Sequence, residues 1–95
     1  MVETKNRSGY VYFIQDTKSL NLKIGCSQNV TNRMKALKTG NPYLKLIVKI
    51  NVSNMREKEK YYHRKFHQYR IKNTEWFEPS CEISLEIIKC QGDDL

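Results

Sequence analysis

The sequence predicts a small α+β domain, a sandwich in which a central three-stranded, mainly antiparallel sheet is flanked by helices. Three observations lead to this prediction. The chain has 95 residues, which suits one domain with a single modest core. Short segments rich in β-branched and aromatic residues alternate with amphipathic segments of helical period. Hydrophobic residues make up 39% and charged residues 28% of the chain, which is typical of a globular protein.

Three segments of the chain are expected to form the sheet. Residues 10–15 (YVYFIQ) are aromatic and β-branched and predict the first strand. Residues 22–25 follow a polar loop and predict its antiparallel partner, so the two form a hairpin. Residues 44–52 (LKLIVKINV) alternate in part between apolar and polar positions, and they predict the third strand.

The first helix is expected between the second and third strands. Ser27 or Asn29 can cap its start, and it should end near Lys38, because residues 39–42 (TGNP) contain the glycine and proline that stop helices. The apolar positions of this segment recur at helical spacing, which places Arg33 at the border of the buried face.

The second helix is expected over residues 55–70, after a capping-box pattern formed by Asn54 and Glu57. Its apolar stripe is formed by Met55, Tyr62, Phe66 and Tyr69. The period of this stripe is completed by Glu59, so a carboxylate is expected to face the sheet. His63 follows one turn later and is expected on the same side.

The C-terminal part predicts a short extended segment at residues 75–77 (EWF) and a last amphipathic helix over residues 81–90. We therefore expect residues 1–8 to be a flexible lead-in, residues 9–90 a single domain, and residues 91–95 a tail.

The charge of the chain favours a polyanionic partner. Seventeen Lys and Arg residues against ten Asp and Glu give a net charge of +7, and nucleic acid is the leading candidate for such a small basic protein. The alternative is that the charge only keeps the protein in solution. The residues expected to contact DNA lie on the two predicted helices: Lys35, Lys38, Arg56, Lys60 and Arg64.

Cysteine usage and hydropathy predict a soluble protein of a reducing compartment, the cytoplasm or the nucleus. Cys26, Cys81 and Cys90 are odd in number and have no CxxC spacing, which disfavours a disulfide framework. The sequence has no apolar run near 18 residues and no signal-peptide pattern, so no membrane partner is expected.

A set of polar side chains predicts phosphodiester hydrolysis. Glu59 supplies one hard oxygen ligand for Mg²⁺ or Mn²⁺, and Lys23 and Arg33 supply cations for a phosphate. Tyr12 supplies a phenol that can take a proton from water, and His63 can face the same cleft. Each residue also has an ordinary structural interpretation, which for Glu59 is a salt bridge.

A zinc site formed by Glu59, His63 and His67 is disfavoured, because the sequence offers no evident fourth ligand.

In their order along the chain, these residues resemble the GIY-YIG nuclease superfamily, and most closely a branch common in phages and large DNA viruses. The matching residues are Tyr12, Lys23-Ile24-Gly25, Arg33, Leu37, Thr39-Gly40-Asn41-Pro42, Glu59, His63, Phe66 and Glu75-Trp76-Phe77. The resemblance covers about residues 9–80. This chain departs from the wider superfamily in having Tyr10 where the first triplet begins with glycine. It also has Lys23 in place of a tyrosine, and Leu37 where a tyrosine or histidine is common.

The resemblance implies the GIY-YIG fold and a role for each matching residue. Tyr12 would take part in activating water, with Lys23 lowering the pKa of its phenol, and Arg33 would contact the scissile phosphate. Glu59 would bind the metal, and His63 would lie near the phosphate. Gly25 would end the second triplet and allow a tight backbone turn.

The function implied is a Mg²⁺- or Mn²⁺-dependent endonuclease that acts on duplex or branched DNA with low sequence specificity. A homodimer or a partner protein would then supply any specificity, and the protein would be virus-encoded and act in the infected cell. Two alternatives stay open: a DNA-binding module that keeps the fold but has little or no cleavage activity, and a protein-interaction module with a basic surface.

Overall fold

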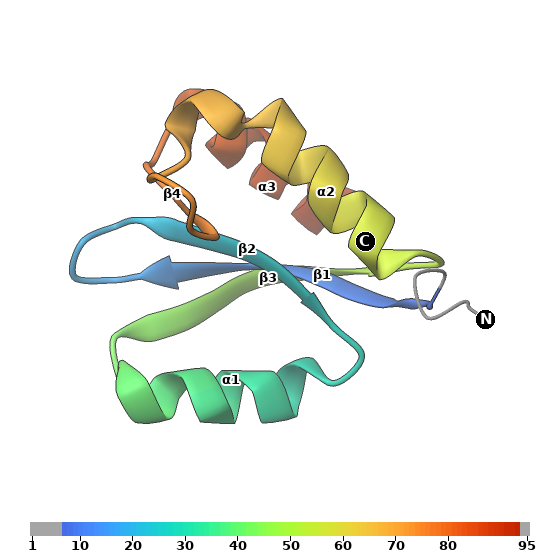
Figure 1. Ribbon diagram of the computed structural model, residues 1–95, viewed down its shortest axis with the longest axis horizontal. Helices are drawn as coiled ribbons and strands as arrows, with labels where there is room; N and C mark the ends of the chain where they lie inside the picture. The colour runs from blue at the N-terminus through green and yellow to red at the C-terminus, as the bar shows by residue number, and fades with distance from the viewer. Residues whose placement is uncertain (1–6, 94–95) are drawn as a thin grey trace.

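The computed structural model describes residues 7–93 and contains one antiparallel sheet with helices on both faces (Figure 1). The elements follow in the order β1 (Gly9–Asp16), β2 (Leu22–Ser27), α1 (Val30–Gly40), β3 (Leu44–Val52), α2 (Met55–Lys65), the 3₁₀ turn η2 (His67–Tyr69), β4 (Trp76–Phe77) and α3 (Cys81–Asp93). The strand order is β3-β1-β2-β4. Helix α1 covers one face, whereas α2 and α3 cover the other (Figure 1).

The α+β class is confirmed, but the sheet has four strands rather than the three predicted. The fourth strand is the EWF segment: Trp76 pairs with Lys23 and Phe77 pairs with Leu22. Two residues are too few to give a clear strand signal in a sequence, because strands usually span about five or six residues.

The predicted hairpin of β1 and β2 is confirmed, and its register decides which side chains share a face. Val11 and Phe13 belong to the core under α2 and α3, whereas Tyr12 and Ile14 belong to the core under α1. Tyr12 lies directly opposite Gly25 of β2. Successive residues of a strand point to opposite faces, so the central strand β1 supplies apolar side chains to both cores.

The predicted third strand is confirmed as β3, and its register against β1 shifts between Phe13 and Ile14. Before the shift, Leu44 lies in the core under α1, and after it, Val48 lies in the core under α2 and α3. The irregularity therefore lets one apolar strand contribute to both cores.

The predicted caps of the first two helices are confirmed. The Asn29 side chain accepts the backbone N–H of Asn32 at 3.0 Å at the start of α1. The Asn54 side chain accepts the backbone N–H of Glu57 at 3.2 Å at the start of α2. These bonds satisfy N–H groups that have no partner within the helix.

Two predicted helix ends are wrong. Helix α2 ends at Lys65 rather than Arg70, because Phe66 leaves the helical conformation and η2 turns the chain back towards the sheet. Arg70 then forms a bridge with Phe77 beside β4. Helix α3 continues to Asp93, so part of the predicted tail is helical.

The start of the expected lead-in lies outside the described residues. Of residues 1–8, the structure describes Arg7 and Ser8, and the backbone carbonyl of Arg7 accepts the N–H of Met55 at 3.0 Å.

Candidate functional site

Tyr12 lies at the centre of the candidate site, and its ring lies across Gly25 on the neighbouring strand. A Cβ atom at position 25 would lie 2.6 Å from the Cζ atom of Tyr12, which is far inside van der Waals contact. Gly25 was expected to allow a tight turn, but none of the described glycines has a positive φ angle. The missing side chain at position 25 instead makes room for the Tyr12 ring.

Burial and a neighbouring cation have opposite effects on the pKa of the Tyr12 hydroxyl. Only 1% of Tyr12 is exposed, and this burial raises the pKa of the phenol. The guanidinium of Arg33, from the exposed side of α1, hydrogen-bonds to the hydroxyl and lowers the pKa in part. We expected Lys23 to lower the pKa of the Tyr12 phenol, but the cation that hydrogen-bonds to the hydroxyl and lowers this pKa is Arg33.

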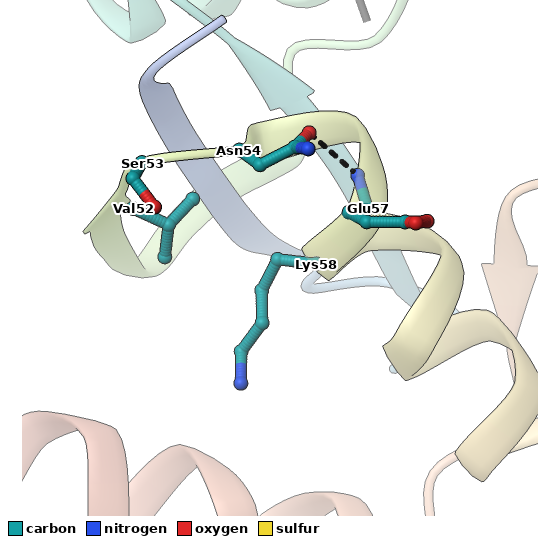
Figure 2. Close-up of a pocket in the computed structure, with 5 residues that line it drawn as sticks. All are labelled: Val52, Ser53, Asn54, Glu57 and Lys58. Carbon is teal, nitrogen blue, oxygen red and sulfur yellow. Dashed lines mark hydrogen bonds between the residues drawn. The ribbon is translucent and has the colours of Figure 1, made fainter. Parts of the chain in front are cut away.

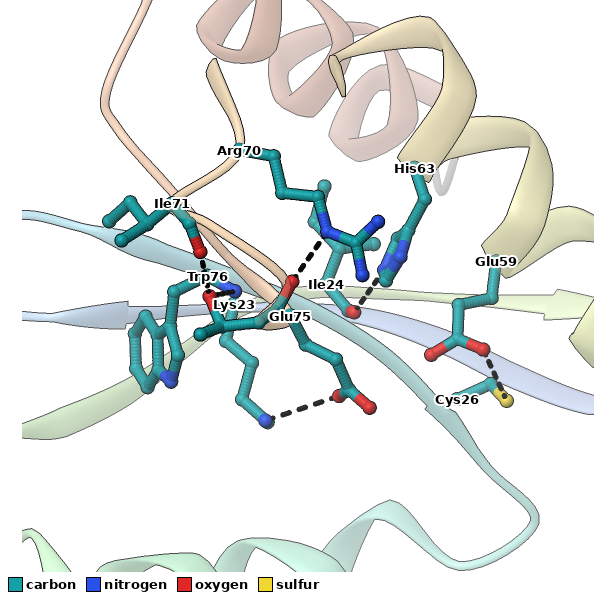
Figure 3. A network of polar contacts seen from close by, with 10 residues as sticks. Lys23, Ile24, Cys26, Glu59, His63, Arg70, Ile71, Glu75 and Trp76 are labelled. Carbon is teal, nitrogen blue, oxygen red and sulfur yellow. Dashed lines mark hydrogen bonds and ion pairs between the residues drawn. The ribbon is translucent and has the colours of Figure 1, made fainter. Parts of the chain in front are cut away.

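Lys23 and Glu75 form an ion pair beside the Tyr12 hydroxyl. The Lys23 ammonium lies 3.1 Å from the Glu75 carboxylate and 5.6 Å from the centre of the Trp76 ring (Figure 3). The backbone carbonyl of Glu75 also accepts the N–H of Ile24 at 3.1 Å. This pairing of β2 with the segment that enters β4 places a second carboxylate at the site.

Glu59 faces the sheet, as its place in the apolar stripe predicted. The Cys26 thiol of β2 donates to the Glu59 carboxylate at 3.6 Å (Figure 3). Burial raises the pKa of Glu59; His63 lowers it and the Glu75 charge raises it further. The same contact and burial raise the pKa of the Cys26 thiol to about 11, so this cysteine stays protonated at neutral pH.

His63 follows Glu59 on α2 and is fixed by the edge of β2. Its Nε2 atom lies 2.8 Å from the backbone carbonyl of Ile24, and its ring packs edge-on against Phe77 (Figure 3). A carbonyl only accepts hydrogen bonds, so Nε2 carries a proton and Nδ1 is the atom left for a ligand. His67 is exposed, and its Nδ1 atom lies 3.3 Å from the Arg64 carbonyl.

The candidate site surrounds the part of β2 that follows its short pairing with β4. Tyr12 and Arg33 lie on the side of α1. Glu59 and His63 approach from α2 on the other side of the sheet (Figure 3). The charges of Glu59 and Glu75 both raise the pKa of Tyr12, so the groups are electrostatically coupled. Residues from β1, α1, α2 and the segment before β4 therefore come together near β2.

The expected DNA-binding residues are not brought together. Lys35 and Lys38 lie on α1, whereas Arg56, Lys60 and Arg64 are exposed on α2, across the sheet. The structure thus divides them between two surfaces.

Glu59 is the carboxylate of the candidate site that was expected to bind a metal ion. Within residues 7–93, no group of three or more His, Cys, Asp or Glu side chains is placed to hold a metal ion. Glu59 could hold a hard cation that keeps most of its water ligands, because such ions need only one or two protein oxygens. Glu75 is the second carboxylate in electrostatic range.

One surface hollow lies away from this site. Its volume is about 450 Å³, and it is a notch where β3 turns into α2, next to the cap formed by Asn54 and Glu57 (Figure 2). It is lined by Val52, Ser53, Asn54, Glu57 and Lys58, and thus by none of the residues that surround Tyr12.

Two members of the site were not predicted from the sequence. Glu75 had no assigned role, and no contact between Cys26 and Glu59 was expected. The ion pair with Lys23 depends on the register of β4, which the residue pattern of a two-residue strand does not specify. The thiol contact depends on how α2 packs on β2.

None of the helices in the described part of the chain combines the length and the apolar character needed to span a bilayer. No curated protein and no solved structure gives a significant match to this chain. One family model matches, over residues 9–91, and its description is "T5orf172 domain". This domain is associated with nuclease-type phage proteins, which supports the coarser part of the resemblance drawn from the motifs. Because the match covers nearly the whole chain, the protein belongs to the T5orf172 domain family.

Proposed function

We propose that this protein is a divalent-metal-dependent endonuclease of the GIY-YIG type, which hydrolyses DNA phosphodiester bonds with low sequence specificity. The main support is that β1, α1 and α2 bring Tyr12, Arg33 and Glu59 near one part of β2: Arg33 hydrogen-bonds to the Tyr12 hydroxyl, and Glu59, which contacts Cys26 of β2, acts on Tyr12 through its charge. The motif resemblance and the nuclease-associated family agree with this combination.

The Glu59 carboxylate suits a Mg²⁺ or Mn²⁺ ion. In the described part of the chain, the salt bridges join Lys23 to Glu75 and Lys65 to Glu86, so Glu59 has no cation in direct contact. A half-buried carboxylate without a paired cation favours a bound ion, because the ion offsets the cost of burying its charge. When bound, the ion would polarise the phosphate and lower the pKa of its coordinated water.

Tyr12 and Arg33 act on the attacking water and the phosphate. In its ionised form, the Tyr12 oxygen accepts a proton from water as the water oxygen bonds to phosphorus. The bond to the leaving ester oxygen breaks, and that oxygen takes a proton from solvent. Arg33 stabilises both the phenolate and the charge that develops on the phosphate. Because burial raises the pKa of Tyr12, the reaction rate should rise with pH above neutrality.

His63 orients the site rather than serving as the base. Its Nε2 proton is committed to the Ile24 carbonyl, which holds α2 and hence Glu59 against β2. The Nδ1 atom can accept a hydrogen bond from water near the phosphate.

The burial of Tyr12 also favours a second candidate function, a DNA-binding module without cleavage. Tyr12 is 1% exposed, so a phosphate can approach its hydroxyl only after the side chains above it move. Arg33 is exposed and is the group best placed to move towards a phosphate. If that movement does not occur, the protein binds DNA and leaves it intact.

A plasmid-nicking assay tests the proposal. Supercoiled DNA is incubated with the wild-type protein and Mg²⁺ or Mn²⁺, and the open-circular product is measured over time, with EDTA as the metal-free control. Glu59→Gln should lower the rate about 100-fold or more, and Tyr12→Phe should do the same by removing one hydroxyl group.

Two substitutions of the same chemistry serve as matched controls. Glu57→Gln changes an exposed carboxylate of the same helix, and Tyr43→Phe changes an exposed tyrosine, so both should cleave at the wild-type rate. If Glu59→Gln nicks DNA as fast as Glu57→Gln, the enzyme proposal fails. If even the wild type binds DNA without nicking it, the binding module is the correct function.

A further inference from the structure

A basic groove lies between α1 and β3, on the side of α1 away from β2. Its volume is about 380 Å³, and Val30, Met34 and Leu46 give it an apolar floor. Its walls carry four lysines: Lys35, Lys38, Lys45 and Lys49. No acidic residue lines it, so its charge is uniformly positive. We refer to it as the lysine groove.

The charges of the lysine groove are available to a ligand. All four lysines are exposed, and the salt bridges found within residues 7–93 involve other lysines. The Lys49 ammonium lies 4.8 Å from the centre of the Tyr10 ring, which holds it at the wall without neutralising it. Closely spaced cations without carboxylate partners favour phosphate groups as ligands.

Helix α1 carries cations on both of its flanks. Lys35 and Lys38 line the lysine groove on the β3 side, whereas Arg33 points to Tyr12 on the β2 side. The helix contains no acidic residue. Its outward side carries the short, exposed side chains Asn32, Ala36 and Thr39. Nothing long or negatively charged therefore prevents this helix from approaching a nucleic acid closely.

We propose that α1 inserts into the major groove of duplex DNA, with the lysine groove binding phosphates of one strand and Arg33 facing a phosphate of the other. A helix with its side chains is about 10–12 Å wide, and the major groove of B-DNA is about 12 Å wide. Phosphates line both borders of that groove, as cations line both flanks of α1. The role of Arg33 rests on the proposed function, whereas that of the lysine groove does not.

This arrangement makes α1, rather than α2, the DNA-binding helix. Arg56, Lys60 and Arg64 lie on the other side of the sheet, and their helix also carries Glu57 and Glu59. A duplex centred on α1 reaches the part of β2 near Arg33 and Glu59, but it does not extend over the exposed side of α2 that carries these three cations.

Fluorescence anisotropy with a labelled duplex tests the lysine groove. Binding is measured in EDTA, so that cleavage plays no part, at a series of salt concentrations. The triple variant K35Q/K38Q/K49Q should reduce the slope of log K against log [salt] by roughly 2 to 3, since each phosphate contact contributes about 0.9. The matched triple variant K18Q/K72Q/K89Q removes the same charge from scattered exposed sites and should change the slope by less than about 1.

The variant R56Q/K60Q/R64Q provides the opposing case. The lysine groove is not the DNA-binding surface if this variant reduces the slope of log K against log [salt] as much as K35Q/K38Q/K49Q or more. The same holds if K18Q/K72Q/K89Q does so. A failure of wild-type nicking leaves this result untouched, so the two proposals fail separately.

A bulky side chain on the outward face of α1 tests the insertion itself. Ala36→Trp should weaken duplex binding at least tenfold while leaving the binding of single-stranded DNA unchanged. Ser84→Trp introduces the same side chain at an exposed position of α3 and should affect neither. Equal binding of duplex by Ala36→Trp and Ser84→Trp would overturn the insertion of α1.

Discussion

The two faces of the sheet differ in how much apolar side chain they bury. The face under α2 and α3 contains a cluster of eleven buried residues, among them Phe13, Phe66 and Phe77. The face under α1 contains four buried residues, and one of them is the functional candidate Tyr12. Burial of apolar area dominates folding free energy, so the larger cluster carries most of the stability.

The face under α1, which has the smaller buried cluster, can therefore hold functional groups. It buries a phenol against a glycine and leaves the cations of α1 exposed around it. The larger face also contains a polar contact, in which the Tyr62 hydroxyl donates to Glu86 at 2.9 Å, but that contact joins α2 to α3. The comparison predicts that truncations in the larger cluster cost more stability than substitutions around Tyr12.

The largest expected effect is from Phe66→Ala in the larger cluster. Phe66 is fully buried and stacks on Tyr62, so its truncation should lower the free energy of unfolding by about 3–5 kcal/mol. Chemical denaturation measures this change. Met34→Ala, in the partly buried shell of the smaller cluster, should cost only about 1–2 kcal/mol. An equal loss for both variants would contradict the comparison of the two faces.

A smaller effect is expected from Gly25→Ala. The new methyl group would meet the Tyr12 ring, so the ring or the strand must shift, at a cost of about 1–3 kcal/mol. Gly40→Ala is the matched control, because a Cβ atom there meets nothing within 4 Å and the φ angle is not positive. It should raise stability by about 0.5–1 kcal/mol. Thermal unfolding of both variants checks whether glycine is needed at position 25 because the Tyr12 ring occupies the space of a Cβ atom.

The smallest effect is expected from the charge of Glu59. Burial raises the pKa of this carboxyl in the folded state, so the folded protein holds the proton more tightly than the unfolded chain. The resulting stability is fully present below the unfolded pKa and is lost as the pH rises through the folded pKa. Glu59→Gln stays neutral, so its melting temperature should exceed that of the wild type increasingly as the pH rises from about 4 to 7.

Mn²⁺ provides the control for this effect. Binding to the folded state stabilises it, so Mn²⁺ should raise the melting temperature of the wild type and not of Glu59→Gln. If the two proteins differ by the same amount at every pH, the charge of Glu59 is not the cause.

Local signals predicted most of the fold. The aromatic and β-branched runs located β1 and β3, and Asn29 and Asn54 marked the helix starts, because these preferences act within a few residues. The end of α2 was missed because it depends on tertiary contact: the pattern through Tyr69 is helical, but the chain must turn at Phe66 for Phe77 to reach β2.

The site was predictable where a residue breaks a pattern. Glu59 stands out because a carboxylate occupies the apolar stripe of α2, and the structure places it against Cys26. The partner of Tyr12 was less predictable, because Lys23 and Arg33 are both cations that the topology brings near. In the structure Lys23 pairs with Glu75, and Arg33 hydrogen-bonds to the phenol.

The place of β3 at one edge of the sheet has a consequence for self-association. An edge strand of nine residues offers unpaired backbone groups to which a strand of another chain can add. Lys45 and Lys49 are exposed along this strand, and their like charges repel a second copy of the same edge. The lysines that we assign to phosphate binding thus also oppose aggregation of the free protein.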